Sequence, residues 1–220
     1  MIKKLFLIVV LLGLIPFGIL AKQKTSVFQT RHNLSASGQG NIKSETETRV
    51  CIFCHSSHNA SSEGPLWNHQ TTTPSKFRSY KSSTMDGMAE QPNGATKLCL
   101  SCHDGTIAVG AIKGLSQPMH MKVAGKGAIP EGRKSNLGTD LSGTHPVSVK
   151  FNQNLTLTDK HLRWPPQDPA NKVGTDADGY VQCTSCHDPH GSASNELPFW
   201  HKETFDEDRK STRLNSSHRL

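Results

Sequence analysis

Long apolar runs, aromatic residues and clustered positive charge are all scarce in this chain of 220 residues. Only 34% of the residues are hydrophobic and 6% are aromatic, so a core made of protein side chains alone would be thin. Lysine and arginine never occur in runs longer than two, although the formal net charge is +7. The basic stripe typical of a nucleic-acid-binding protein is therefore missing.

Cysteine is equally sparse, and its placement is the strongest signal in the sequence. All six cysteines belong to three copies of Cys-x-x-Cys-His, at residues 51–55, 99–103 and 183–187. Two thiols three positions apart lie on one side of a helical turn and can meet both vinyl groups of a porphyrin, and the next residue then carries an imidazole to the iron. This pattern predicts three covalent c-type haems, with thioether bonds at Cys51, Cys54, Cys99, Cys102, Cys183 and Cys186 and proximal iron ligands at His55, His103 and His187.

Other uses of paired cysteines fit less well. A zinc site would take four ligands from two pairs, which leaves one pair over, and it requires no histidine after every second cysteine. A thioredoxin-like pair expects a βαβ context, which does not surround these motifs. Disulfides remain open for an exported chain, but three short loops of identical design would be an unusual framework.

The first 21 residues are typical of a secretory signal peptide. Lys3 and Lys4 precede a nearly unbroken apolar run from residue 5 to residue 20, and Ala21 offers a cleavage site. An uncleaved anchor is the alternative, weakened by a proline and glycines within a run that is short for a stable membrane span. Export would place the protein in the periplasm or outside the cell, where c-type haem is attached.

Removal of the leader changes the charge balance. Loss of Lys3 and Lys4 leaves +5, and six haem propionates would bring the net charge to about −1 before the irons are counted. We therefore expect no nucleic-acid partner. Residues 22–205 are predicted to form one three-haem domain. Residues 206–220 are charged and rich in serine and arginine, and part of this stretch resembles a translated cloning adaptor, so we expect a disordered and non-native tail.

The predicted fold is mostly coil with short α-helices at the haem motifs and a few short β-strands, organised around haems. No long apolar period supports a long helix or a large sheet. Residues 22–50 are predicted to form an extended arm. A short helix should end near Gly105, residues 143–149 alternate like a short strand, and Trp67 is expected to pack against a haem. Without haem the chain should be largely unfolded.

Nine further histidines are available to bind iron opposite the proximal ones. His58 and His190 each follow a proximal histidine by three positions, hence lie on the same side of the same turn, and could reach only a neighbouring haem. His145 is a third candidate and His32 a fourth. Three sites need three ligands, so at least one of the four is spare. Methionine ligation of one haem is a further alternative.

Several segments together resemble multihaem c-type cytochromes of the doubled Cys-x-x-Cys-His type, some of which assemble into extracellular filaments. They are residues 49–60, 65–68, 102–106, 143–147 and 183–191. The resemblance implies bis-histidine, low-spin haems and an electron-carrying role. It favours His58, His145 and His190 as distal ligands and supports His32. Members of this group often continue to another attachment motif, which this sequence lacks.

The expected function is that of an exported electron carrier that is not an enzyme. Its partners would be other cytochromes or a membrane quinol-linked complex, with self-assembly into a filament as an additional option and no stable membrane span. The main rival is a haem enzyme or sensor, in which one iron keeps an open sixth position for a small molecule.

Overall fold

The computed structural model describes the chain over residues 26–71, 76–123, 127–159, 162–166 and 174–191. The expected leader at residues 1–21 and the expected tail at residues 206–220 lie outside the described residues. Among the helices that are described, none has the length and apolar character needed to cross a bilayer.

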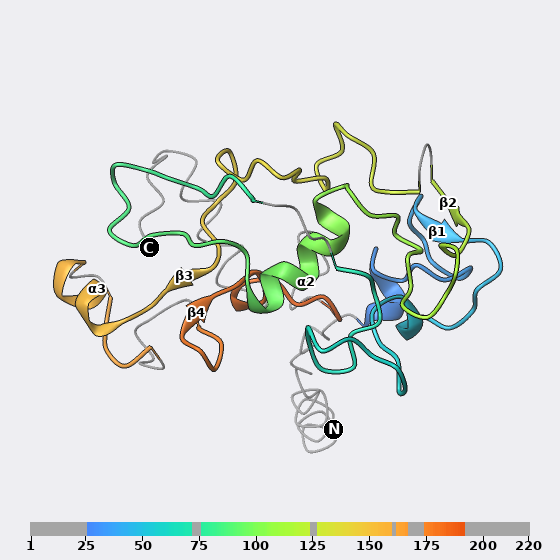
Figure 1. Cartoon of the computed structure of the whole chain (residues 1–220), viewed down its shortest axis with the longest axis horizontal. Helices are drawn as coiled ribbons and strands as arrows, with labels where there is room; N and C mark the ends of the chain where they lie inside the picture. Colours follow the sequence, from blue (N-terminus) through green and yellow to red (C-terminus); the bar gives the residue numbers. More distant parts are fainter. Residues whose placement is uncertain (1–25, 72–75, 124–126, 160–161, 167–173, 192–220) are drawn as a thin grey trace, which may run out of the picture.

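Most of the described chain is coil, with short regular elements. The 3-10 turns are η1 (Val27–Gln29), η2 (Cys51–Phe53) and η3 (Cys183–Ser185), the helices are α2 (Gly94–His103) and α3 (Gln153–Thr158), and the strands are β1 (Lys43–Ser44), β2 (Met121–Lys122), β3 (Val149–Lys150) and β4 (Tyr180–Val181). β1 pairs with β2 and β3 with β4, both antiparallel. Helix α2 lies in the middle of the molecule, between the two small sheets (Figure 1).

Helix α2 ends where the second attachment motif ends. The backbone N–H of Asp104 donates to the Leu100 carbonyl at 3.0 Å, and the N–H of Gly105 donates to the Cys102 carbonyl at 3.2 Å. Gly105 has φ +70°, a left-handed conformation that glycine adopts without steric cost and that commonly terminates helices. The expected helix end near Gly105 is therefore found, and it fixes His103 on the last turn.

Two local predictions differ from the structure. The alternating segment at residues 143–149 does not form a strand over its length, because Ser148 has φ +53° and interrupts the extended backbone. Strand β3 begins only at Val149. Residues 26–50 are not a simple extended arm, because Asn33 and Ser35 are buried. The Asn33 amide donates to the Phe28 carbonyl at 3.0 Å and its Oδ1 accepts from the Ser35 hydroxyl at 2.7 Å.

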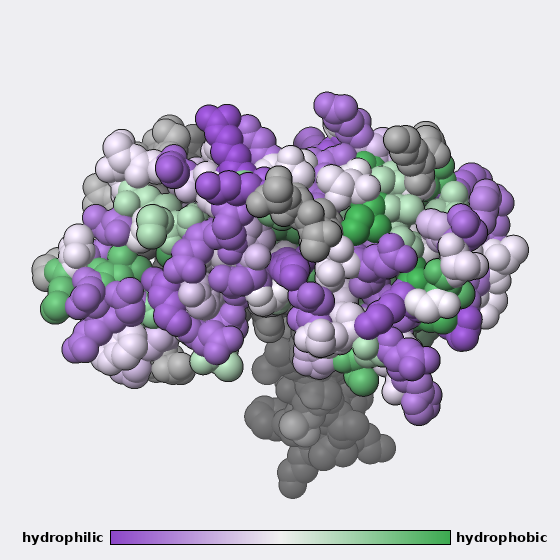
Figure 2. Space-filling view, viewed as in Figure 1, coloured by the Kyte–Doolittle hydropathy of each residue, from purple (hydrophilic) through white to green (hydrophobic). Residues whose placement is uncertain are grey.

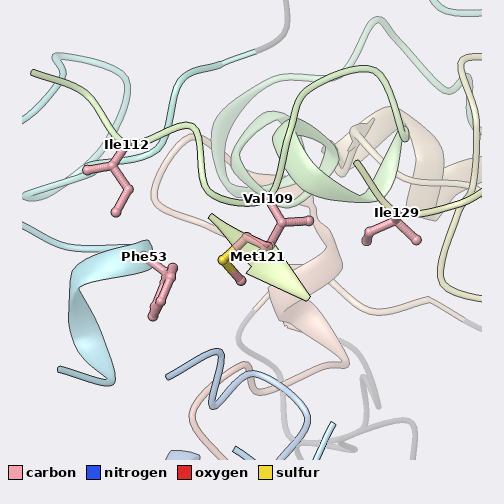
Figure 3. Packing of buried hydrophobic residues seen from close by; sticks show 5 residues of the cluster. All are labelled: Phe53, Val109, Ile112, Met121 and Ile129. Atoms are coloured by element: carbon pink, nitrogen blue, oxygen red, sulfur yellow. The ribbon is translucent and has the colours of Figure 1, made fainter. Parts of the chain in front are cut away.

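The interior is small and unusually polar. Among the described residues, fourteen buried hydrophobic side chains are matched by thirteen buried polar or charged ones. The larger apolar cluster joins Phe53, Val109, Ile112, Met121 and Ile129 (Figure 3). On the face seen in Figure 2, apolar residues form separate patches within a largely hydrophilic surface. Side-chain packing of this extent stabilises a chain of this length only weakly.

A buried polar network fastens the third attachment motif to α2. The Thr96 hydroxyl donates to Gln182 Oε1 at 2.6 Å and accepts from the Cys183 N–H at 3.2 Å. Gln182 Nε2 in turn donates to Asn93 Oδ1 at 2.6 Å and to Asp176 Oδ2 at 2.8 Å. Every polar atom of the Gln182 side chain is thus used, which makes this residue the link between α2 and η3.

Replacement of Gln182 by alanine is expected to lower the free energy of unfolding by about 2 kcal/mol, since it leaves several buried donors and acceptors unpaired. Denaturant titration of the haem-loaded protein measures this change, with intact mass confirming that the haem count is unaltered. Gln39→Ala, at an exposed position, is the matched control and should stay within about 0.5 kcal/mol of the parent. Equal stabilities for the two variants would refute the role of the network.

Candidate functional site

The three Cys-x-x-Cys-His motifs each form a helical turn, although the first and third begin as the 3-10 turns η2 and η3 and the second lies in α2. The His55 N–H donates to the Cys51 carbonyl at 2.8 Å, and the His187 N–H donates to the Cys183 carbonyl at 2.9 Å. His103 occupies the last turn of α2, four positions after Cys99. In each case the histidine lies one turn beyond the first cysteine, as attachment of one porphyrin by two thioethers and one imidazole requires. We refer to these as the first, second and third attachment sites.

Each proximal histidine faces a second histidine from a distant part of the chain. The ring centroids of His55 and His190 lie 6.1 Å apart. Those of His103 and His32 lie 6.0 Å apart, and those of His187 and His145 lie 6.2 Å apart. The angles between the ring planes are 15°, 80° and 30°, respectively. The near-equal separations are the central geometric feature of the molecule.

A separation of this size suits one iron atom held between two imidazoles. Each iron–nitrogen bond is about 2 Å long, so two rings bound from opposite sides have centroids about 6 Å apart. Within the described residues no three histidine, cysteine or carboxylate side chains converge as they would around a bare metal ion. An iron that is already bound by four porphyrin nitrogens needs only two more ligands, and each histidine pair would supply them. The residues present therefore fit c-type haem.

Hydrogen bonds at Nδ1 leave the opposite nitrogen of these rings available for iron. His32 Nδ1 donates to the Pro189 carbonyl at 3.0 Å, His103 Nδ1 to the Ser135 carbonyl at 2.7 Å and His145 Nδ1 to the Pro146 carbonyl at 3.4 Å. His190 Nδ1 lies 3.6 Å from Asp188 Oδ1. Because a carbonyl can only accept, these contacts select the Nδ1–H tautomer, which orients a ligating histidine and makes it more basic.

His32 is further held in the form that binds metal. Burial, with repulsion from His103 as the next cause, lowers the pKa of His32 to about 4. The ring is thus neutral at ordinary pH, and only a neutral imidazole offers a lone pair to iron.

Of the four predicted distal candidates, three lie beside a proximal histidine, namely His32, His145 and His190. His58 does not pair with a proximal histidine in this way. Each proximal histidine faces a ring other than that of His58. The His58 side chain is exposed, and its backbone is engaged in a turn with the Ser56 hydroxyl, to which its N–H donates at 3.3 Å. Ligation by His58 stays a prediction, and the geometry favours His32 in its place.

The attachment sites adjoin one another. The Cys99 thiol donates a hydrogen bond to the Cys183 sulfur, which lowers the pKa of Cys183 to about 7 and raises that of Cys99. Cys54 and Cys102 both pack against the larger apolar cluster. Burial raises the pKa of Cys54 to about 11 and that of Cys102 to about 12. The cysteines of the second site therefore lie close to cysteines of both other sites.

Residues 187–190 connect all three sites within four positions. His187 is the proximal histidine of the third site, and His190 faces His55 of the first. The Pro189 carbonyl accepts from His32 of the second site. A segment shared in this way holds the three histidine pairs in fixed relative positions.

Two further side chains lie beside the attachment sites: Trp67, whose expected packing against a haem stays a prediction, and His69, which was not among the predicted ligands. The Trp67 ring lies 6.1 Å from the His55 ring at 89°, and its buried Nε1 has no hydrogen-bond partner among the described residues. A buried donor without an acceptor is costly, and a haem propionate would supply one. The His69 ring is buried, with Nε2 3.5 Å from Cys102 Sγ. The only feature of the sequence that pointed to His69 was its position two residues after Trp67, in the most apolar part of a polar loop.

Together, the paired histidines and the attachment motifs define a protein that binds c-type haem. A family model described as the doubled CXXCH motif matches residues 177–206, which contain the third attachment site. The match is consistent with the resemblance to multihaem c-type cytochromes drawn above, and it implies covalently bound haem. A cytochrome motif of this kind suggests an electron carrier. No curated protein shows significant similarity to the chain.

Proposed function

We propose that the chain is an electron-transfer protein that carries three covalently attached c-type haems, each with two histidine ligands. The observation that carries this proposal is the set of three histidine pairs with ring centroids 6.0 to 6.2 Å apart. Haem iron held by two histidines is low-spin and changes oxidation state by one electron without gaining or losing a ligand.

The chain contributes fixed geometry. In this proposal the iron at the three sites would be bound by His55 with His190, His103 with His32, and His187 with His145, which would leave no iron position for a substrate. The adjoining sulfur atoms of Cys99 and Cys183 and the shared segment at residues 187–190 keep the sites close together. Such closeness supports transfer of electrons from site to site within one molecule.

Export and partners belong to the same proposal. Attachment of c-type haem outside the cytoplasm supports a periplasmic or extracellular location, in an anaerobic or extracellular respiratory chain. The partners would then be other cytochromes or a membrane quinol-linked complex. Self-assembly into a haem filament is compatible with this role and would be seen by imaging of particles at working concentration.

Spectroscopy of the matured protein tests the axial ligation. Intact mass should give three haems per chain, and EPR of the oxidised protein should contain low-spin signals only. The reduced protein should not bind carbon monoxide, because histidine would occupy both ligand positions that the porphyrin leaves on each iron. All three haems should then be reoxidised on mixing with a soluble ferric cytochrome. A substoichiometric high-spin signal together with carbon monoxide binding would instead support the haem enzyme or sensor.

A further inference from the structure

Asp104 is a buried carboxylate with one unpaired oxygen. The residue is 3% exposed. Its Oδ1 accepts from the Thr106 N–H at 2.9 Å and from the Thr106 hydroxyl at 2.8 Å. Its Oδ2 is buried without a hydrogen-bond partner among the described residues. Burying a carboxylate oxygen without a hydrogen bond costs free energy, so a carboxylate at this position needs a physical explanation.

The position of Asp104 connects it to the second attachment site. It directly follows His103 and caps the C-terminal end of α2, where the helix carboxyl end already places partial negative charge. The turn at Gly105 and the two bonds from Thr106 hold the side chain in place.

The equivalent positions at the other two sites differ. Ser56 follows His55, and its hydroxyl donates to the His58 carbonyl, so no charge stands there. Asp188 follows His187 and is also buried, but its Oδ1 accepts from the His190 N–H at 2.9 Å and lies 3.6 Å from His190 Nδ1. Among the described residues, no lysine or arginine forms an ion pair with Asp104. The Asp104 charge acts to raise the pKa of the nearby His69, but burial lowers that pKa by more, so the His69 ring is neutral and does not balance the carboxylate.

We propose that the fixed negative charge of Asp104 lowers the reduction potential of the haem that His103 and His32 would hold. This inference rests on the proposed function. Reduction adds one electron to iron and removes one positive charge from the haem, with no bond made or broken. A nearby buried carboxylate stabilises the oxidised form more than the reduced one, because charges interact strongly where water is excluded.

The second haem can be recognised by its spectrum. Its ligand rings are near perpendicular, at 80°, whereas the other two pairs stand at 15° and 30°. Near-parallel rings act on one iron d orbital more than another and give a rhombic low-spin EPR signal. Perpendicular rings leave these orbitals nearly equal in energy and give one broad feature at a large g value. The large-g feature therefore reports the oxidation state of the second haem alone.

The test is a redox titration of the haem-loaded full-length protein at one fixed pH, followed by EPR. Asp104→Asn should make reduction of the large-g haem about tenfold more favourable, the order expected for loss of one charge several ångströms away in a partly buried site. The two other haems should be affected less. Asp104→Glu should restore most of the parent behaviour, and Asp178→Asn, at an exposed position, should change nothing.

Asp104→Ser keeps the test decisive if Asp104→Asn assembles poorly, because serine already follows the proximal histidine of the first site. Either variant that carries three low-spin haems and titrates like the parent would overturn the inference. Loss of the second haem from both variants would also overturn it, because the role would then be structural. Failure of the proposed function itself is separate, since it would appear as missing or high-spin haem in the unsubstituted protein.

Discussion

Replacement of His32 by alanine is expected to convert one of three haems from low-spin to high-spin and to create one carbon monoxide site per chain. The ring of His32 lies 6.0 Å from that of His103, and its Nδ1 is fixed by the Pro189 carbonyl at 3.0 Å. Alanine cannot bind iron, so the second haem would keep only His103. EPR of the oxidised variant and carbon monoxide titration of the reduced variant measure the change against the haem count from intact mass.

His58→Ala is the matched control. Its side chain is exposed, and the three proximal histidines already face other rings, so all haems should stay low-spin. His145→Ala and His190→Ala should each reproduce the His32→Ala result at a different site. The opposite outcome, with His58→Ala high-spin and His32→Ala unchanged, would instead favour the set His58, His145 and His190 inferred from sequence resemblance.

The sequence pattern does not predict that His190, and not His58, lies beside a proximal histidine. Both follow a proximal histidine by three positions, so spacing treats them alike. The structure separates them through their neighbours. The Asp188 carboxylate accepts from the His190 N–H, whereas Asn59, next to His58, has φ +56° and turns the backbone differently. Which histidine then meets which site depends on contacts across the fold, such as that of His32 with Pro189, which a local pattern cannot encode.

Structure that depends on interactions within a few residues was easier to predict from the sequence than backbone conformation that depends on tertiary contacts. The attachment motifs specify short turns, and Gly105 specifies the end of α2, because both follow from interactions within a few residues. The strand expected at residues 143–149 was not found over that range, because the conformation of Ser148 is set from outside the segment. Its Oγ accepts from the Asn93 N–H at 3.2 Å, and this tertiary contact overrides the alternating pattern.

The polar interior was foreseen only in part. Composition indicated a thin apolar core, but not that buried Asn33, Gln182 and Asp104 would occupy so much of it. Buried polar groups of this kind depend on partners far apart in sequence, as in the bond of Thr96 to Gln182. The Asp104 carboxylate likewise gave no sequence signal beyond its place after His103.

Protein made without haem attachment is expected to show no cooperative unfolding transition, its free energy of unfolding falling from several kcal/mol to near zero. The described interior buries few apolar side chains, and its two apolar clusters join only five and three buried residues. Backbone ordering costs about 1 kcal/mol or more per residue, which so little apolar burial cannot offset. Thermal melts followed by far-ultraviolet circular dichroism, with and without the haem-attachment machinery, measure the difference.

A variant that lacks only the first pair of thiols, Cys51→Ser with Cys54→Ser, provides the intermediate case. It should carry two haems and unfold cooperatively at a lower temperature than the parent, because the histidine pairs at the second and third sites do not depend on Cys51 or Cys54. If the haem-free chain instead melted cooperatively near the parent temperature, the polypeptide alone would determine the fold. The histidine pairs would then be a preformed frame into which haem is inserted, rather than one that haem attachment assembles.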